Sequence, residues 1–140
     1  MTRKLVLSID CSTTAVKAIA WDHRGNAVAE GRAAYPLNQP QPNWYEQDAD
    51  QWWRALCQAS MACVDQLDSP SVEALCITNQ RETVVPVDGD GNPLRPAISW
   101  LDERSRVQVE QVSQMFGWDA VHQLTGKPPS VNVVPPKLLW

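Results

Sequence analysis

Apolar and polar residues alternate along the first quarter of the chain, in the way that β-strands require. The stretches 5–9, 16–21 and 27–35 are each short and are separated by polar residues. A period of two predicts strands with one buried face. Because short loops join antiparallel neighbours, these three stretches predict an antiparallel meander.

The spacing of apolar residues becomes helical after the proline-containing loop 36–43. Asp48 and Gln51 match a capping box, which predicts a helix from Asp48 to about Leu67. At helical spacing one face of this helix would be buried, and it carries Trp53, Leu56, Cys57, Ser60, Val64 and Leu67.

A short apolar run, 72–78, follows the helix and predicts a buried parallel strand. A strand meander followed by a helix and a parallel strand is typical of the α/β class with a mixed sheet.

The second half of the chain predicts shorter elements. Asp102 is expected to cap a helix, and Gly117 to end it in the left-handed conformation. We expect a hairpin turn at 88–92 and a strand at 96–100. Two helices should follow, at 103–116 and 119–124, and a third should open at 137–140. Because the chain stops on an apolar helical turn, we expect it to be a fragment.

Composition and charge narrow the class of protein. The 140 residues are 44% hydrophobic and 20% charged, which is ordinary for one modest domain or part of a larger one. A net charge of -4 argues against nucleic acid as the main partner. No apolar run has the roughly 18 residues of a membrane span.

The N-terminus lacks the pattern of a signal peptide, so we expect a cytoplasmic protein with free thiols at its four cysteines. Seven Trp stand against one Phe. Aromatic rings of this kind favour sugar clefts and interfaces, but we expect Trp21, Trp52 and Trp53 to lie in the core.

The tip of the first hairpin is the first candidate site. Asp10 ends the first strand, and the hydroxyl residues Ser12, Thr13 and Thr14 follow it. A turn with exposed backbone N–H groups suits a phosphate, and a carboxylate suits a divalent cation. The alternative is a polar β-turn whose hydroxyls simply face solvent.

The second candidate site follows the parallel strand, where ligands of open α/β sheets bind. Arg81 and Glu82 together offer the donors and acceptors that vicinal hydroxyls need. Trp100 could lay its ring on the C–H face of a carbon chain. The alternative is a buried Arg81–Glu82 ion pair with Trp100 in the core.

Five motifs in a fixed order connect these two sites to a known family. They are Ile9-Asp10 with the hydroxyls that follow, Trp44-Tyr45-Glu46-Gln47-Asp48, Thr78-Asn79-Gln80-Arg81-Glu82-Thr83, Ala97-Ile98-Ser99-Trp100 with Asp102 and Arg104, and Thr125-Gly126 with Pro136-Lys137-Leu138-Leu139-Trp140. In this order the chain resembles the amino-terminal part of the FGGY carbohydrate kinases. The third motif looks most like glycerol kinase, and the second and the end of the fifth look more like xylulokinase.

The resemblance implies a ribonuclease-H-like, actin-like domain and the ATP-dependent phosphorylation of a sugar or polyol hydroxyl. By the resemblance, Asp10 would help hold Mg²⁺. Ser12, Thr13, Thr14 and Lys17 would line the phosphate site. The sugar would be bound by Arg81, Glu82, Trp100 and Asn132. The expected partner is a small sugar or polyol, with a homo-oligomer left open and neither nucleic acid nor a membrane expected.

The family pattern also implies what lies elsewhere. Its catalytic aspartate and its second, nucleotide-binding domain belong to a later part of the chain, so residues 1–140 would be a truncated sugar-binding domain, inactive alone. Ser12 stands where the family usually has Gly, and Asn132 stands where glycerol kinases have a substrate-contacting Tyr, which argues against glycerol. No Walker A motif is present, so a P-loop kinase is excluded.

Three other functions remain open. The chain could be a non-catalytic module that binds sugar or phosphate. A ribonuclease-H-like nuclease would need further carboxylates near Asp10 and a basic surface. An actin-like ATPase would have no use for the residues Arg81, Glu82 and Trp100.

Overall fold

The computed structural model describes residues 4–140, which form two compact units. We call them the sheet unit (residues 4–36 and 48–80) and the helical unit (residues 37–47 and 81–140).

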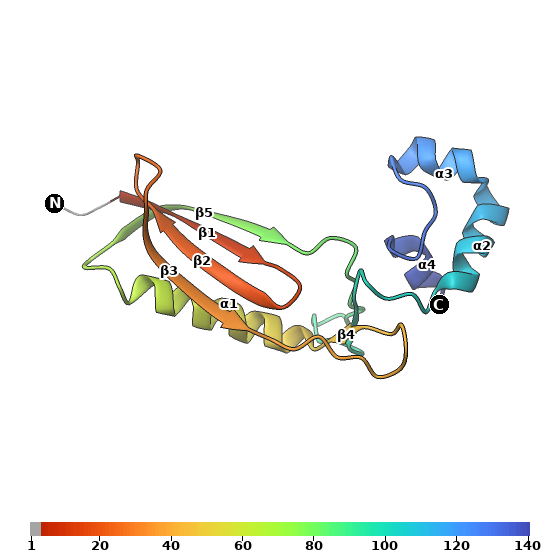
Figure 1. Cartoon of the computed structure of the whole chain (residues 1–140), viewed down its shortest axis with the longest axis horizontal. Helices are drawn as coiled ribbons and strands as arrows, with labels where there is room; N and C mark the ends of the chain where they lie inside the picture. Colours follow the sequence, from red (N-terminus) through yellow and green to blue (C-terminus); the bar gives the residue numbers. More distant parts are fainter. Residues whose placement is uncertain (1–3) are drawn as a thin grey trace. The chain divides into compact units, whose positions relative to one another are not determined.

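The sheet unit contains four strands and one helix (Figure 1). Strand β5 is parallel to β1, whereas β1, β2 and β3 form an antiparallel meander in the sheet order β3-β2-β1-β5. The mixed α/β sheet is therefore confirmed. The elements are β1 (Lys4–Cys11), β2 (Ala15–Trp21), β3 (Ala27–Ala34), α1 (Ala49–Val64) and β5 (Ser71–Asn79).

The core of the sheet unit lies between one face of the sheet and α1. Leu5, Leu7 and Ile9 point into it from β1, and their polar or exposed neighbours alternate with them, as the period of two requires. Helix α1 packs against β1, β2 and β3. Along the helix the N-cap is Asp48, whose side chain accepts a hydrogen bond from the backbone N–H of Asp50.

The predicted buried face of α1 is wrong in part. The fully buried residues of the helix are the small side chains Ala55, Ala59 and Cys63, whereas Trp53 is 67% exposed. The cause is a close approach at Gly31 on β3, where an added Cβ would lie 2.0 Å from the Ala59 carbonyl oxygen. A helix this close to a sheet has no room for a large side chain between them.

Trp52 is half-buried and packs against the edge of the core, as expected. Trp21 is also half-buried, and its indole Nε1 donates to the hydroxyl of Ser8 at 2.8 Å. The helix ends at Val64, three residues earlier than predicted, with Asp65 as its C-cap.

Strand β5 is in the predicted place, but the expectation that it is buried is wrong. Leu75 is 55% exposed and Ile77 is 53% exposed. The strand pairs with β1 on one edge, and α1 packs against the other three strands. The apolar composition of β5 is therefore not matched by burial within the described residues.

The helical unit combines a small sheet with three helices. Its elements are β4 (Glu46–Gln47), β6 (Ala97–Ile98), α2 (Arg106–Phe116), α3 (Trp118–Thr125) and α4 (Val134–Leu139). Strands β4 and β6 are antiparallel. The predicted turn at 88–92 is present, and the Asp88 carboxylate closes it by accepting from the backbone N–H groups of Asp90 and Asn92.

Two helix starts and the conformation of one C-cap differ from the prediction. Helix α2 begins at Arg106 with Ser105 as its N-cap, so Asp102 is not the cap. Gly117 has the expected positive φ of 81°, but its ψ of 138° lies outside the left-handed helical region. Helix α4 begins three residues early, because proline is tolerated in the first turn, where its missing N–H has no helical partner.

All four cysteines, Cys11, Cys57, Cys63 and Cys76, are free, as predicted. Within residues 4–140, no helix has the length and apolar character needed to span a bilayer.

The approach of α1 to β3 generates a stability prediction. Replacing Gly31 by Ala places a methyl group against the Ala59 carbonyl and should lower the free energy of unfolding by about 3 kcal/mol. Gly89→Ala is the control, because an added Cβ meets nothing within 4 Å there. Chemical denaturation of both variants measures the difference, and equal stabilities would contradict the close packing.

Candidate functional site

Asp10 lies at the end of β1, between two neighbouring strands. Its register partners are Lys17 on β2 and Thr78 on β5. The Asp10 side chain is exposed, and its Oδ1 accepts a hydrogen bond from the Thr78 hydroxyl at 2.7 Å. The carboxylate is thus oriented by the protein and reachable from solvent.

The loop that follows Asp10 is tied to the end of β3. The Ser12 hydroxyl donates to the Ala15 carbonyl at 3.0 Å, and the Tyr35 hydroxyl donates to the Ser12 carbonyl. The Tyr35 backbone N–H donates to the Thr14 carbonyl at 3.0 Å. Among the described non-glycine residues, positive φ occurs at Asn43, Ser69 and Glu82, so the turn at Ser12 does not require glycine.

Burial and the nearby charges raise the pKa of Tyr35 to about 12. Burial, followed by the charge of Asp10, also raises the pKa of the Cys11 thiol. Both effects favour the neutral phenol and the neutral thiol beside the Asp10 carboxylate.

The other predicted phosphate residues lie on the same hairpin. Thr13 and Thr14 form its tip between β1 and β2. The Lys17 ammonium is 3.2 Å from the Glu30 carboxylate, in a pair whose side chains are 45% and 51% exposed. Because a pair this exposed contributes at most about 1 kcal/mol, Lys17 can leave Glu30 for another anion.

The residues present offer one carboxylate to a metal. Within residues 4–140, no group of three His, Cys, Asp or Glu side chains is arranged to hold a metal ion. Asp10 alone fits a hard cation that takes most of its oxygen ligands from water and phosphate, as Mg²⁺ does.

Glu82 is the most constrained of the predicted sugar-binding residues. Its backbone is left-handed, with a φ of 61°, a conformation that costs a residue with a Cβ about 1–2 kcal/mol. One carboxylate oxygen accepts from the Lys127 ammonium, and the other accepts from the Val134 backbone N–H at 3.0 Å. The hydrogen bond from Lys127 is the main cause of the lowered pKa of Glu82.

Trp100 and Asn132 are connected to the same corner. The Asn132 amide donates to the Trp100 carbonyl at 3.0 Å, and the Trp100 backbone N–H donates to the Thr83 hydroxyl at 3.1 Å. Thr83 and Glu82 are adjacent in the chain. The structure therefore brings Glu82, Trp100 and Asn132 together within the helical unit.

The alternative interpretation, a buried Arg81–Glu82 ion pair with Trp100 in the core, is wrong. Glu82 pairs with Lys127, not with Arg81, which is exposed. Trp100 is 37% exposed and does not belong to the core.

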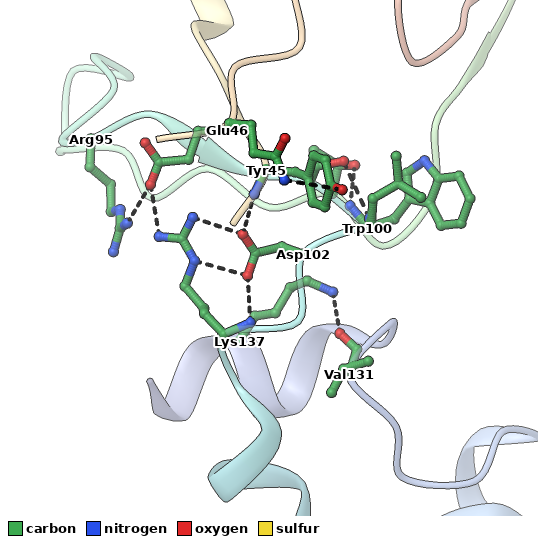
Figure 2. Close-up of polar contacts among 12 residues, drawn as sticks. Tyr45, Glu46, Arg95, Trp100, Asp102, Val131 and Lys137 are labelled. Carbon is green, nitrogen blue, oxygen red and sulfur yellow. Dashed lines mark hydrogen bonds and ion pairs between the residues drawn. The ribbon is translucent and has the colours of Figure 1, made fainter. Parts of the chain in front are cut away.

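Asp102 holds the polar network beside this corner (Figure 2). It is fully buried, and its two carboxylate oxygens accept from Nε and Nη2 of Arg104, both at 2.8 Å. The Tyr45 backbone N–H donates to the same carboxylate at 2.6 Å. The same carboxylate also accepts from the Arg104 backbone N–H at 2.9 Å, and Ser105, not Asp102, is the N-cap of α2.

Arg104 is held from several sides. Its guanidinium stacks on Trp44 at 3.9 Å and lies 5.0 Å from the ring of Trp140. Its Nη1 is 2.7 Å from a carboxylate oxygen of Glu46, which also pairs with Arg95 at 3.3 Å. A planar guanidinium paired with carboxylates is the form in which a positive charge is tolerated inside a protein.

Lys137 links this network to the loop that carries Asn132. It is 3% exposed, and its ammonium donates to the Val131 carbonyl at 2.7 Å (Figure 2). Burial lowers the pKa of Lys137, and the charges of Asp102 and Glu82 oppose that shift. The ammonium thus fixes the backbone one residue before Asn132.

Sequence reasoning missed the supporting residues of this site. Arg104 and Lys137 both stand in the motifs that carry the family resemblance, but their pattern alone indicates no contact partner. Lys127 follows Thr125-Gly126 in a segment that predicts only a proline-broken loop. The spacing of 45 residues between Lys127 and Glu82 gives no signal that they meet.

Comparison with known proteins places this geometry in a family. The model of the N-terminal domain of the FGGY family of carbohydrate kinases matches residues 5–140. A glycerol kinase from Thermococcus gammatolerans is 32% identical over 98% of this chain and 28% of its own length. An apulose kinase from Pectobacterium atrosepticum is 43% identical over 72% of this chain and 21% of its own length.

Solved structures agree. The crystal structure of Plasmodium falciparum glycerol kinase with ADP matches with a TM-score of 0.90 and 30% identity, covering 99% of this chain and 28% of that one. The fold is therefore of the actin-like ATPase class. The chain belongs to the FGGY family of carbohydrate kinases, and it spans 28% of the length of the glycerol kinases that it matches.

The Asp102–Arg104 pair generates a second stability prediction. Asp102→Asn leaves a buried guanidinium short of one carboxylate and should lower the free energy of unfolding by about 3 kcal/mol. The control is Glu103→Gln, because the Glu103–Arg106 pair is partly exposed and contributes at most about 1 kcal/mol. Thermal unfolding measures both, and an Asp102 variant as stable as its control would contradict the role of the pair.

Proposed function

We propose that the protein containing this chain transfers the γ-phosphoryl group of ATP to a hydroxyl of a small sugar or polyol. In this proposal the chain is the N-terminal, sugar-binding domain, and a second domain that binds the nucleotide belongs to the longer protein. Family membership supports the reaction class. The exposed apolar side chains of β5 support the existence of further chain that covers them.

The observation that carries the sugar site is the set of contacts within the helical unit. The Glu82 carboxylate accepts a hydrogen bond from the Val134 backbone N–H. The Trp100 backbone forms hydrogen bonds with the hydroxyl of Thr83, the neighbour of Glu82, and with the Asn132 amide. The Glu82 carboxylate, the Trp100 backbone and the Asn132 amide are thus held in a fixed arrangement on separate chain segments. Such a fixed set of polar groups selects ligands by their hydroxyl pattern, because a wrong ligand does not match its donors and acceptors.

Each residue has a distinct task in this proposal. The Glu82 carboxylate accepts hydrogen bonds from sugar hydroxyls, and the Arg81 guanidinium donates to their oxygens. Trp100 packs its half-exposed ring against the C–H groups of the sugar. Asn132 supplies an amide that can both donate and accept.

The hairpin tip serves the phosphate groups. Asp10 provides a carboxylate ligand for Mg²⁺, which neutralises charge on the phosphates of the bound nucleotide. Ser12, Thr13 and Thr14 offer hydroxyls and backbone N–H groups, and Lys17 offers a cation. Phosphoryl transfer depends mainly on such positioning and charge neutralisation. The residue that takes the proton from the sugar hydroxyl is expected outside residues 1–140.

The remaining expectations follow from the same proposal. ATP, Mg²⁺ and a small sugar or polyol are the ligands, the protein works in the cytoplasm, and a homo-oligomer is left open. A nuclease is disfavoured, because Asp10 has no group of converging metal-binding side chains among residues 4–140.

The direct test is an ADP-release assay of the full-length protein with a panel of sugars, polyols and sugar acids. We expect ADP release to depend on one member of the panel. Binding of a sugar without ADP release would favour the non-catalytic module, and absence of both would reject the proposal.

Glu82→Ala should weaken sugar use far more than folding. Loss of hydrogen bonds to a charged acceptor predicts a fall in kcat/KM of roughly 100-fold. Stability should change by at most about 1 kcal/mol, because the Glu82–Lys127 pair is partly exposed. Glu103→Ala, which removes a similar exposed ion pair, should leave kcat/KM unchanged. A large loss of stability at Glu82 with unchanged kcat/KM would assign it a structural role.

Asp10→Asn should raise the Mg²⁺ concentration needed for half-maximal activity by roughly tenfold or more and lower kcat. The KM for the sugar should be unchanged, because Asp10 lies in the sheet unit and not among the sugar-binding residues. Asp90→Asn, in the turn at 88–92, is the matched control. An unchanged Mg²⁺ dependence would remove the proposed metal role of Asp10.

A further inference from the structure

The ion pair between Lys127 and Glu82 sits inside the proposed sugar site and is not explained by a role for Glu82 alone. The Lys127 side chain is 44% exposed and the Glu82 side chain 24%, so the pair borders solvent. A lysine ammonium has three N–H donors and no acceptor. One donor engages Glu82, and the exposure of the side chain lets the others reach a ligand.

The charges around this pair are predominantly positive. Arg81 precedes Glu82 in the chain and is exposed. The charge of Lys137 acts on Glu82, together with that of Lys127, and contributes to the lowered pKa of this carboxyl. The neighbouring carboxylate of Asp102 is already paired with Arg104. Two cationic side chains, Lys127 and Lys137, therefore act on the Glu82 carboxylate, and Arg81 precedes it in the chain.

The hydrogen-bonding pattern of this corner also favours a negatively charged ligand group. Each Glu82 oxygen already accepts one hydrogen bond from the protein, from Lys127 or from Val134. The remaining lone pairs can still accept a ligand hydroxyl. The remaining donors of Lys127 are best matched by a ligand group that only accepts and carries negative charge. A carboxylate is such a group.

Resting on the proposed kinase function, we propose that Lys127 is a specificity-determining residue that selects sugar acids, binding the substrate carboxylate while Glu82 accepts an adjacent hydroxyl. The substrate class is then a small polyhydroxy carboxylate such as an aldonate. A neutral sugar or polyol would leave the Lys127 charge matched only by Glu82 and would bind less tightly.

The test compares an aldonate with the alditol of the same chain length and configuration, using the full-length protein. The two ligands differ only in one carboxylate against one hydroxymethyl group. We expect the aldonate to have a kcat/KM at least tenfold higher, the factor for one charge-assisted hydrogen bond. Lys127→Met should abolish this preference through KM for the aldonate, and Lys127→Arg should retain most of it.

Lys4→Met is the matched control, because Lys4 forms an exposed ion pair with Glu73 in the sheet unit and should not change the preference. Equal use of both ligands by the wild type, or an aldonate preference that persists in Lys127→Met, would overturn the inference while the kinase function stands. The wild-type comparison decides the matter even if the variant does not fold. ADP release with no member of the panel would instead reject the proposed function itself.

Discussion

The buried pair of Asp102 and Arg104 is the interaction on which the helical unit depends. Moving two charges into a protein interior is unfavourable unless each hydrogen-bonding group is satisfied. Here the carboxylate binds Arg104 and the Tyr45 backbone N–H, and the guanidinium also pairs with Glu46 and stacks on two indole rings. Because the partners come from 44–46, 102–104 and the last residue of the chain, the pair joins three distant segments.

The proposed sugar site is built on this support. Trp100, one of the proposed sugar-binding residues, precedes Asp102 by two residues in the chain. Lys137 lies near Asp102 and holds the Val131 carbonyl, and Asn132 follows at once in the chain. The buried pair therefore lies beside the chain segments that hold Trp100 and Asn132. The sheet unit depends on close packing instead, because small residues on α1 and Gly31 on β3 let the helix approach the sheet closely.

Sequence reasoning worked best where periodicity is strong and contacts are local. The strands of the meander, the parallel strand after α1 and the turn at 88–92 all appear as predicted. The predicted face of α1 was wrong, because counting apolar residues favours Trp53, whereas the close approach at Gly31 admits only small side chains such as Ala59. Hydrophobic spacing reports which residues prefer burial, but it does not report the distance between layers.

The chain's own sequence determined the order of strands and helices, the family motifs and the positions of Asp10 and Glu82, because these follow from local pattern and spacing. Only the tertiary structure decided that Lys127 pairs with Glu82 and that Asp102 binds Arg104 instead of capping α2. It also decided that Lys137 fixes the loop before Asn132. The physical reason is that charged groups pair with the partners that lie close to them in the folded state. Those partners are up to 58 residues apart in the chain.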